Sequence, residues 1–256
     1  MLRRQFSDAC VIGVPLFCTA LSAGARAAFV PGEFISYGQD NWGTLADPAS
    51  QLLLSQFFQV YPAGGVEMGI PGDAGYFAFF TSGDASVDYL PTSGTADALV
   101  SEYIDPMSTS AGIFGGYVPS LNFDVDFGDA GYLNGTALAP FGDLVLHDLA
   151  APYAYFNGLT VREFRVAANV ILGGGALPAN ITYDDVAALT ESLTLSFQGG
   201  TPTQFAQDHL TSPEPTAIPE PSAVALAGIG MLVMMLMRRR DRRRYAAEAV
   251  SYVRIG

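Results

Sequence analysis

The fold class is predicted from the stretch Leu121-Asn122-Phe123-Asp124-Val125-Asp126-Phe127. Apolar and polar residues alternate along it, which is the period of a β-strand with one buried face and one solvated face. Asp143 to Leu149 alternates in a similar way. Tyr76 to Thr81 and Ala85 to Leu90 are apolar runs of strand length around the turn Ser82-Gly83-Asp84. We therefore expect a β-rich, sandwich-like domain up to about residue 157.

Two helices are expected inside this first part of the chain. Asp47 followed by Pro48 is a helix start with proline in the first turn, so Pro48 to Phe58 is predicted as a helix. Ser93 to Tyr103 is predicted as a second, shorter helix.

The last third has helical periodicity. Thr160 and Glu163 form a capping box, and the helix that they open ends at Gly173-Gly174-Gly175. Thr182 opens another helix, and Thr201-Pro202 opens a third, short one. We expect an α+β domain over residues 28–211, with a cluster of short helices over 158–211.

The end of the chain reads as a membrane segment. A Pro-rich linker, residues 212–218, precedes Pro219-Glu220-Pro221, and residues 222–237 are apolar and uncharged. As a helix they cover roughly 24 Å, short of the ~30 Å hydrocarbon core, so a transmembrane helix here needs local thinning of the bilayer. Short loops rich in arginine stay cytoplasmic, which places residues 245–256 inside and everything before Pro219 outside. The flanking arginines are Arg238, Arg239, Arg240, Arg242, Arg243 and Arg244.

These tail residues resemble a known family signal. Pro219, Glu220 and Pro221, the short apolar helix and the arginine cluster are similar to the PEP-CTERM sorting signal of certain Gram-negative bacteria, here over residues 219–244. The resemblance implies that a membrane protease-transpeptidase, exosortase, recognises and processes the chain, in bacteria that often make an exopolysaccharide or biofilm matrix. It implies nothing about the domain upstream. Members of that family usually stop soon after the arginines, whereas this chain continues to Gly256.

The N-terminus also predicts export. Arg3 and Arg4 precede a mostly apolar run, and Ala25-Arg26-Ala27 is a small-x-small cleavage site, so residues 1–27 read as a signal peptide cut after Ala27. Both cysteines, Cys10 and Cys18, lie inside this segment. The exported domain therefore has no disulfide and no cysteine nucleophile.

Charge is divided between the ends and the body. The chain has no lysine, and ten of its twelve arginines lie in the two terminal segments. Residues 28–218 keep only Arg162 and Arg165 against 21 acidic residues. Such a surface repels nucleic acid and suits divalent cations and high solubility. We expect no nucleic-acid partner.

A weak metal site and three functions are predicted from the domain. Asp124, Asp126 and Asp129 are oxygen ligands at spacings that calcium accepts, although the spacing is not that of an EF-hand; no other cofactor is expected. The first function is a non-enzymatic exported protein of the cell surface or matrix. The second is a carbohydrate (exopolysaccharide)-binding module, and the third is a secreted hydrolase that uses His147 or His209 as its base. The candidate sugar-stacking residues are Tyr76, Phe77, Phe79, Phe80, Tyr153, Tyr155 and Phe156.

Overall fold

The computed structural model describes residues 28–133, 135–137 and 139–213, and within them the chain forms helices with two small sheets. The α-helices are α1 (Gln39–Gly43), α2 (Pro48–Val60), α3 (Gly83–Tyr89), α4 (Phe114–Asp129), α5 (Val161–Leu172), α6 (Tyr183–Thr194) and α7 (Gln204–His209). The strands are β1 (Val66–Gly69), β2 (Phe77–Phe80), β3 (Tyr103–Ile104), β4 (Val145–Leu146) and β5 (Leu210–Thr211). Three short 3₁₀ turns cover Gly72–Ala74, Phe141–Asp143 and Tyr153–Phe156.

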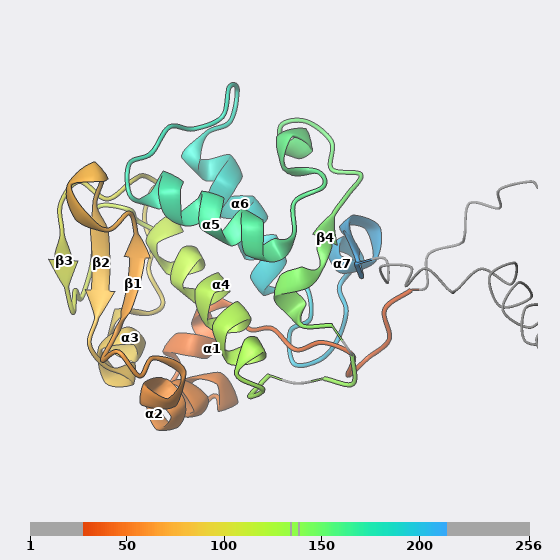
Figure 1. The fold of residues 1–256 in the computed structure, drawn as a ribbon, viewed down its shortest axis with the longest axis horizontal. Helices are drawn as coiled ribbons and strands as arrows, with labels where there is room; N and C mark the ends of the chain where they lie inside the picture. The colour runs from red at the N-terminus through yellow and green to blue at the C-terminus, as the bar shows by residue number, and fades with distance from the viewer. Residues whose placement is uncertain (1–27, 134, 138, 214–256) are drawn as a thin grey trace, which may run out of the picture.

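Helix α4 forms the centre of the domain. It crosses the middle with α5 and α6 on one side and α1 and α2 on the other (Figure 1). Most of its side chains are buried, including polar ones such as Asn122 and Asp124. Phe123 and Phe127 pack on the buried indole of Trp42, with ring centroids 5.4 and 5.5 Å from it. A helix buried on all sides needs partners for its polar side chains, and these partners organise the rest of the fold.

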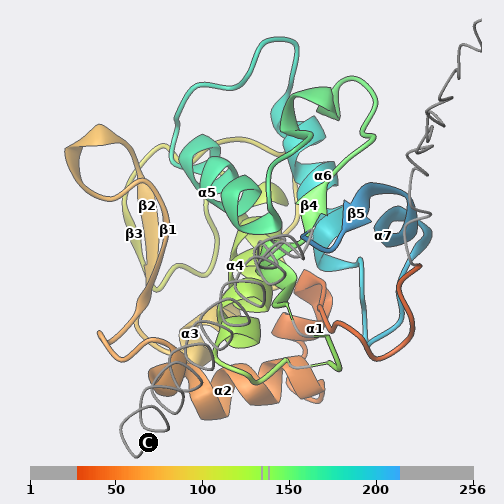
Figure 2. The same ribbon diagram turned by 45° about the vertical axis from the view of Figure 1, so that its right-hand side comes forward.

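The larger sheet has the order β1-β2-β3 and lies beside α5, away from α7 and β5 (Figure 2). Strands β1 and β2 are antiparallel, with Val66 opposite Phe80, and β2 and β3 are parallel. The sheet is attached to the end of α5 because the Tyr76 N–H donates to the Gly173 carbonyl oxygen over 2.9 Å. A β-carbon at Gly173 would lie 2.5 Å from the Ile70 nitrogen, so this close approach requires glycine.

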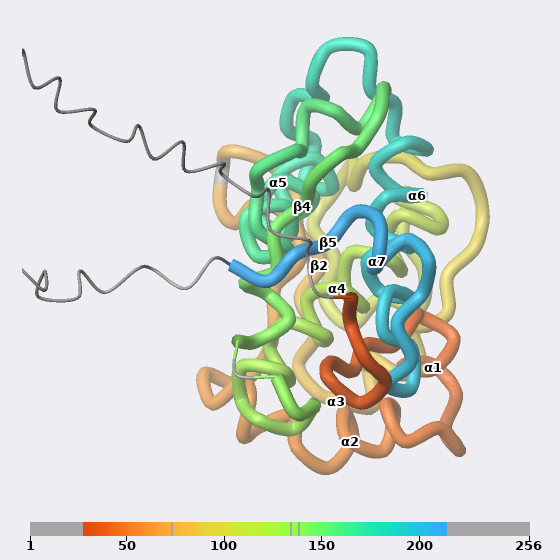
Figure 3. The backbone as a smooth tube through the Cα atoms, turned by 90° about the vertical axis from the view of Figure 1, so that its right-hand side faces the viewer, coloured from red at the N-terminus to blue at the C-terminus, as the bar shows by residue number. Residues whose placement is uncertain are grey.

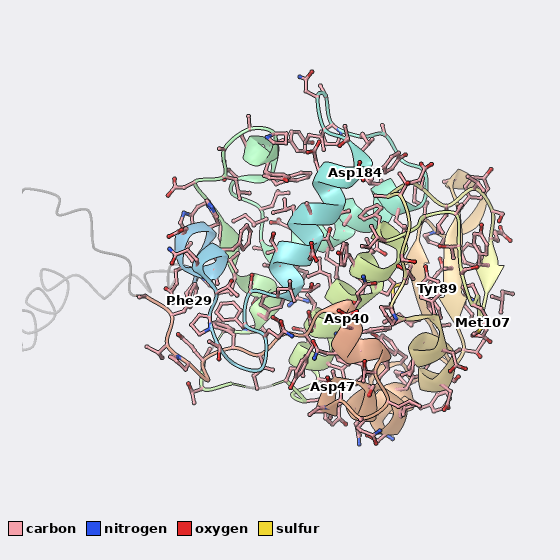
Figure 4. All side chains as sticks on the ribbon, turned by 180° about the vertical axis from the view of Figure 1, so that it is seen from behind. Phe29, Asp40, Asp47, Tyr89, Met107 and Asp184 are labelled. Atoms are coloured by element: carbon pink, nitrogen blue, oxygen red, sulfur yellow. The ribbon has the colours of Figure 1, made fainter. Side chains whose placement is uncertain are left out.

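The two ends of the described part lie on the same side of the domain (Figure 3). The Phe29 N–H donates to Gln207 Oε1 over 2.9 Å, and Gln207 Nε2 donates back to the Phe29 carbonyl oxygen over 2.8 Å. The Phe29 ring also packs on Phe197, with centroids 5.1 Å apart. Phe29 and Met107 lie at opposite ends of the molecule (Figure 4), so both chain ends leave from the side remote from the three-stranded sheet.

The predicted strand Leu121 to Phe127 is wrong, because these residues lie inside α4. The alternation of polar and apolar residues arises because the polar side chains bind neighbouring elements instead of water. The predicted strand Ala85 to Leu90 is also wrong: α3 occupies that segment, and Ser82 caps it by accepting from the Ala85 N–H. No helix forms over residues 93–103.

The α+β class is confirmed, but the β-rich first half is not. The described residues contain one three-stranded and one two-stranded sheet, with no sandwich of packed sheets. The predicted strand at Asp143 to Leu149 is reduced to β4, while Tyr76 to Thr81 contains β2 as predicted. The helices after Asp47, Thr160 and Thr182 are confirmed, and the latter two have complete capping boxes. The third expected helix is α7, capped by Thr203.

Over the described part of the chain, no helix is both long enough and apolar enough to cross a bilayer. The predicted signal peptide with Ala25 and Ala27, the transmembrane helix 222–237 and the sorting residues from Pro219 to Arg244 lie outside the described residues.

Asp124 is a fully buried carboxylic acid on α4. Its Oδ1 accepts the Tyr37 backbone N–H over 2.8 Å, while Oδ2 has no partner at normal hydrogen-bond distance within the described residues. Burial raises the pKa of Asp124 well above its usual range, and the hydrogen bond from the Tyr37 N–H opposes this only in part.

We predict that Asp124 makes the stability of the domain depend on pH. Because its pKa is raised in the folded state, its contribution is complete below the unfolded pKa of about 3.9 and is lost as the pH rises through the folded value. Relative to Asp124→Asn, the wild-type protein should lose up to about 1.4 kcal/mol per pH unit in that window. Chemical denaturation from pH 4 upward measures the two slopes.

The exposed Asp88→Asn variant controls for the change in net charge. It should keep the wild-type pH slope. If the free energy of unfolding changed with pH equally in the wild-type protein and in Asp124→Asn, the pKa of the buried carboxyl would be the same in the folded and unfolded states.

Candidate functional site

Helices α4 and α5 face each other through three pairs of polar side chains, which we call the polar ladder. Asn169 Nδ2 donates to Asn122 Oδ1 over 2.9 Å, Arg165 forms an ion pair with Asp126, and Arg162 binds Asp129 through two bonds of 2.5 and 2.9 Å. Positions 122, 126 and 129 on α4 therefore match positions 169, 165 and 162 on α5. Steps of four and three residues keep each set on one face of its helix, and the reversed order makes the helices antiparallel.

The middle pair of the ladder is fixed from a third side. Asp126 Oδ2 accepts the hydroxyl of Tyr61 over 3.0 Å, while Oδ1 faces Arg165. Burial, followed by the charge of Asp126, raises the pKa of Tyr61 well above its usual value, so the phenol stays protonated and donates. Both carboxylate oxygens are therefore occupied, Oδ2 by the Tyr61 hydroxyl and Oδ1 by Nη1 of Arg165.

The two arginines of α5 have different surroundings. Arg162 binds Asp143 over 3.1 Å in addition to Asp129, and its hydrogen bond to Asp129 is the main cause that raises its pKa. Arg165 contacts Asp126 through Nη1 alone, and its Nε and Nη2 have no acceptor among the described residues. Arg162 is saturated, whereas Arg165 keeps free donors.

Arg165 lines a pocket between β1 and α5, which we call the β1–α5 pocket. It has a volume of about 350 Å³, within the range of small-molecule sites. The Gly69 N–H donates to Asn169 Oδ1 over 3.0 Å, which fixes the spacing of the strand and the helix. Both β1 and α5 contribute charged or polar residues as well as aliphatic ones. The lining residues are Val66, Glu67, Gly69, Ile70, Pro71, Asn122, Asp126, Arg165, Val166, Asn169 and Val170.

Glu67 contributes the second free charge of the pocket. Its side chain is exposed, and among the described residues its carboxylate has neither an ion pair nor a hydrogen bond. Asn122 and Asn169 instead bind each other, so they support the floor of the pocket rather than face a ligand. The pocket thus offers a free carboxylate, the free edge of a guanidinium and an aliphatic wall.

The three predicted calcium ligands do not converge. Asp124 binds the Tyr37 N–H, Asp126 binds Arg165 and Tyr61, and Asp129 binds Arg162. Over the described ranges, no group of three or more His, Cys, Asp or Glu side chains is placed to hold a metal ion.

The other candidate residues are dispersed. Both ring nitrogens of His147 are engaged, Nδ1 with Asp148 over 2.9 Å and Nε2 with the Leu210 carbonyl oxygen over 3.1 Å. His209 Nδ1 lies 3.3 Å from the His147 carbonyl oxygen. Among the predicted sugar-stacking residues, Phe80 and Phe156 are fully buried, Phe77, Phe79 and Tyr153 are half-buried, and Tyr76 and Tyr155 are exposed.

Sequence reasoning missed the β1–α5 pocket. The sequence does contain a signal for the contact between α4 and α5, which forms one part of the pocket. The spacing of Asn122, Asp126 and Asp129 is repeated in reverse order by Arg162, Arg165 and Asn169. Reading that signal requires that residues 121–127 be recognised as a helix. Nothing in the sequence around Glu67 indicates that β1 lies beside α5.

We predict that the polar ladder stabilises the domain through its buried rung. Asn122→Ala and Asn169→Ala should each lower the free energy of unfolding by about 1–3 kcal/mol, because each removes the hydrogen bonds between the two amides in a largely buried setting. A double-mutant cycle should give a coupling of about 1 kcal/mol. The half-exposed Asp129–Arg162 pair is the control, with a coupling below about 1 kcal/mol. Additive effects at Asn122 and Asn169 would contradict this role.

We also predict that calcium does not stabilise the domain through Asp124, Asp126 and Asp129. Each carboxylate already has a protein partner that a metal ion would have to displace. The melting temperature should agree in EDTA and in millimolar calcium. A melting temperature that rises by several degrees in calcium, with the rise abolished by Asp129→Asn, would contradict this prediction and support a metal site.

Comparison with known proteins identifies the end of the chain only. No curated protein and no solved structure is significantly similar to the chain. Residues 217–243 match the family model of the PEP-CTERM protein-sorting motif, and they include Pro219, Glu220 and Pro221. This match confirms the resemblance seen in the sequence and supports export with membrane-associated sorting by an exosortase. The chain therefore carries a PEP-CTERM protein-sorting motif near its C-terminus.

Proposed function

We propose that the chain is a non-enzymatic exported protein of the cell surface or extracellular matrix, delivered through its PEP-CTERM motif. The single observation that carries this proposal is the match over residues 217–243. In the proposed course, an exosortase-type enzyme recognises Pro219, Glu220 and Pro221 while the apolar segment 222–237 holds the chain in the membrane. The arginines that follow keep the end of the chain in the cytoplasm until processing.

The charge of the body supports this route. Apart from Arg162 and Arg165, the segment 28–218 has no arginine or lysine, and both arginines form ion pairs with α4. An acidic domain of this kind is highly soluble and does not adhere to anionic lipid or nucleic acid. It is thus suited to release from the membrane once the tail has been removed.

The non-enzymatic interpretation is supported by the surroundings of His147, one of the two candidate bases. A hydrolase base needs a ring nitrogen that can accept a proton from a nucleophile. In His147, one nitrogen faces a carboxylate and the other faces a backbone carbonyl oxygen. The carbohydrate-binding alternative has no comparable support from the aromatic residues, because Phe80 and Phe156 are core residues.

We predict that processing depends on one of two identical tripeptides. Pro213-Glu214-Pro215 repeats the residues of Pro219-Glu220-Pro221 but lies outside the matched segment. Replacing residues 219–221 with alanine should leave the chain full-length and in the membrane fraction. The wild-type protein should end near Pro219 and leave that fraction. Fractionation of the producing cells with mass spectrometry of the mature C-terminus measures both outcomes.

The matched control is the same alanine replacement at residues 213–215, which should be processed like the wild-type protein. The proposal fails if the wild-type chain keeps its arginines in mature material, or if both replacements block processing equally.

A further inference from the structure

The β1–α5 pocket presents one carboxylate without a protein partner among the described residues and one guanidinium that is only partly engaged. Glu67 has no partner, and Arg165 keeps its Nε and Nη2 donors free after binding Asp126. Asp126, itself bound by the Tyr61 hydroxyl, anchors the guanidinium of Arg165 through Nη1. The planar edge of a guanidinium matches the two oxygens of a carboxylate.

The remaining wall of the pocket is aliphatic and accessible. Val166 and Val170, one turn apart on α5, are 56% and 42% exposed, and Ile70 and Pro71 line the opposite side. Exposed valines on a helix face of an otherwise well-packed domain indicate a contact surface for an apolar group. The pocket therefore suits a ligand with one positive group, one negative group and an aliphatic portion.

Charge excludes the simpler ligand classes. With two carboxylates and one guanidinium, the pocket has a net negative charge and repels a plain anion, and a plain cation would leave the free donors of Arg165 without an acceptor. A neutral sugar could bind the polar groups, but its ring would meet valines and a proline instead of an aromatic face. A zwitterion uses both free charges and keeps its own net charge at zero.

From these contacts we infer that the β1–α5 pocket binds a zwitterionic α-amino acid with an aliphatic side chain. Arg165 donates hydrogen bonds to the α-carboxylate, and Glu67 accepts hydrogen bonds from the α-ammonium group. Val166 and Val170 cover the aliphatic side chain of the ligand. This binding activity is separate from sorting, because it depends on the folded domain and not on residues 217–243.

The test is isothermal titration of the full-length chain, purified in mild detergent, with leucine as the probe. Saturable binding is expected. N-acetylleucine lacks the ammonium charge and leucinamide lacks the carboxylate, so each should bind at least about tenfold more weakly. Glycine, which has no side chain to place against the valines, should also bind more weakly.

Variants assign each charge to its residue. Glu67→Gln should lower the affinity for leucine and remove the difference between leucine and N-acetylleucine. Arg165→Gln should remove the difference between leucine and leucinamide. Glu67 is exposed and unpaired, so its replacement leaves the fold intact even if Arg165→Gln does not. Arg162→Gln, on the same helix but bound to Asp129 and Asp143, is the matched control with unchanged affinity.

Three results would overturn the inference. The first is the absence of saturation by leucine at millimolar concentrations. The second is unchanged discrimination between leucine and N-acetylleucine in Glu67→Gln. The third is binding of a methyl hexoside in place of leucine, weakened by the same two variants, which would assign the pocket to neutral sugars.

Discussion

Burial of α4 on every side is the constraint from which the rest of the structure follows. A helix placed at the centre of a domain has no wet face, so each polar side chain must find a protein partner or weaken the fold. Asn122 and Asp126 find theirs on α5, while Asp124 binds the segment before α1. Residues four positions apart lie on one face of a helix, whereas residues two positions apart point in nearly opposite directions. Asn122 and Asp126 therefore anchor α5, while Asp124 anchors the opposite side.

The same constraint explains why the fold was only partly predictable. Helices α5 and α6 lie at the surface, with one apolar stripe each and capping boxes at Thr160 and Thr182. Both helices could therefore be predicted from the sequence alone. Helix α4 has no polar face, and its alternating pattern imitates a half-buried strand. A helix forms here instead of a strand because α5 and the backbone at Tyr37 supply hydrogen-bond partners for its polar side chains. These partners lie far away in sequence. Local patterns do not carry that information.

The β1–α5 pocket shares this origin. Its floor and its anchored arginine exist because α4 and α5 bind each other, and its other wall exists because Gly69 and Gly173 let the sheet approach α5 closely. The sorting motif, in contrast, is a short contiguous signal that needs no tertiary structure to be read. The chain thus combines an address that can be read directly from the sequence with a domain whose binding surface arises only on folding.

The attachment of both chain ends at one side has a mechanical consequence. A tensile load applied through residue 213 reaches β5 and α7 first, and β5 is joined to β4 through only two residue pairs. The next restraint is the reciprocal pair of bonds between Gln207 and Phe29. A load of this kind is therefore taken up first at this corner of the domain, before it reaches α4 and the three-stranded sheet.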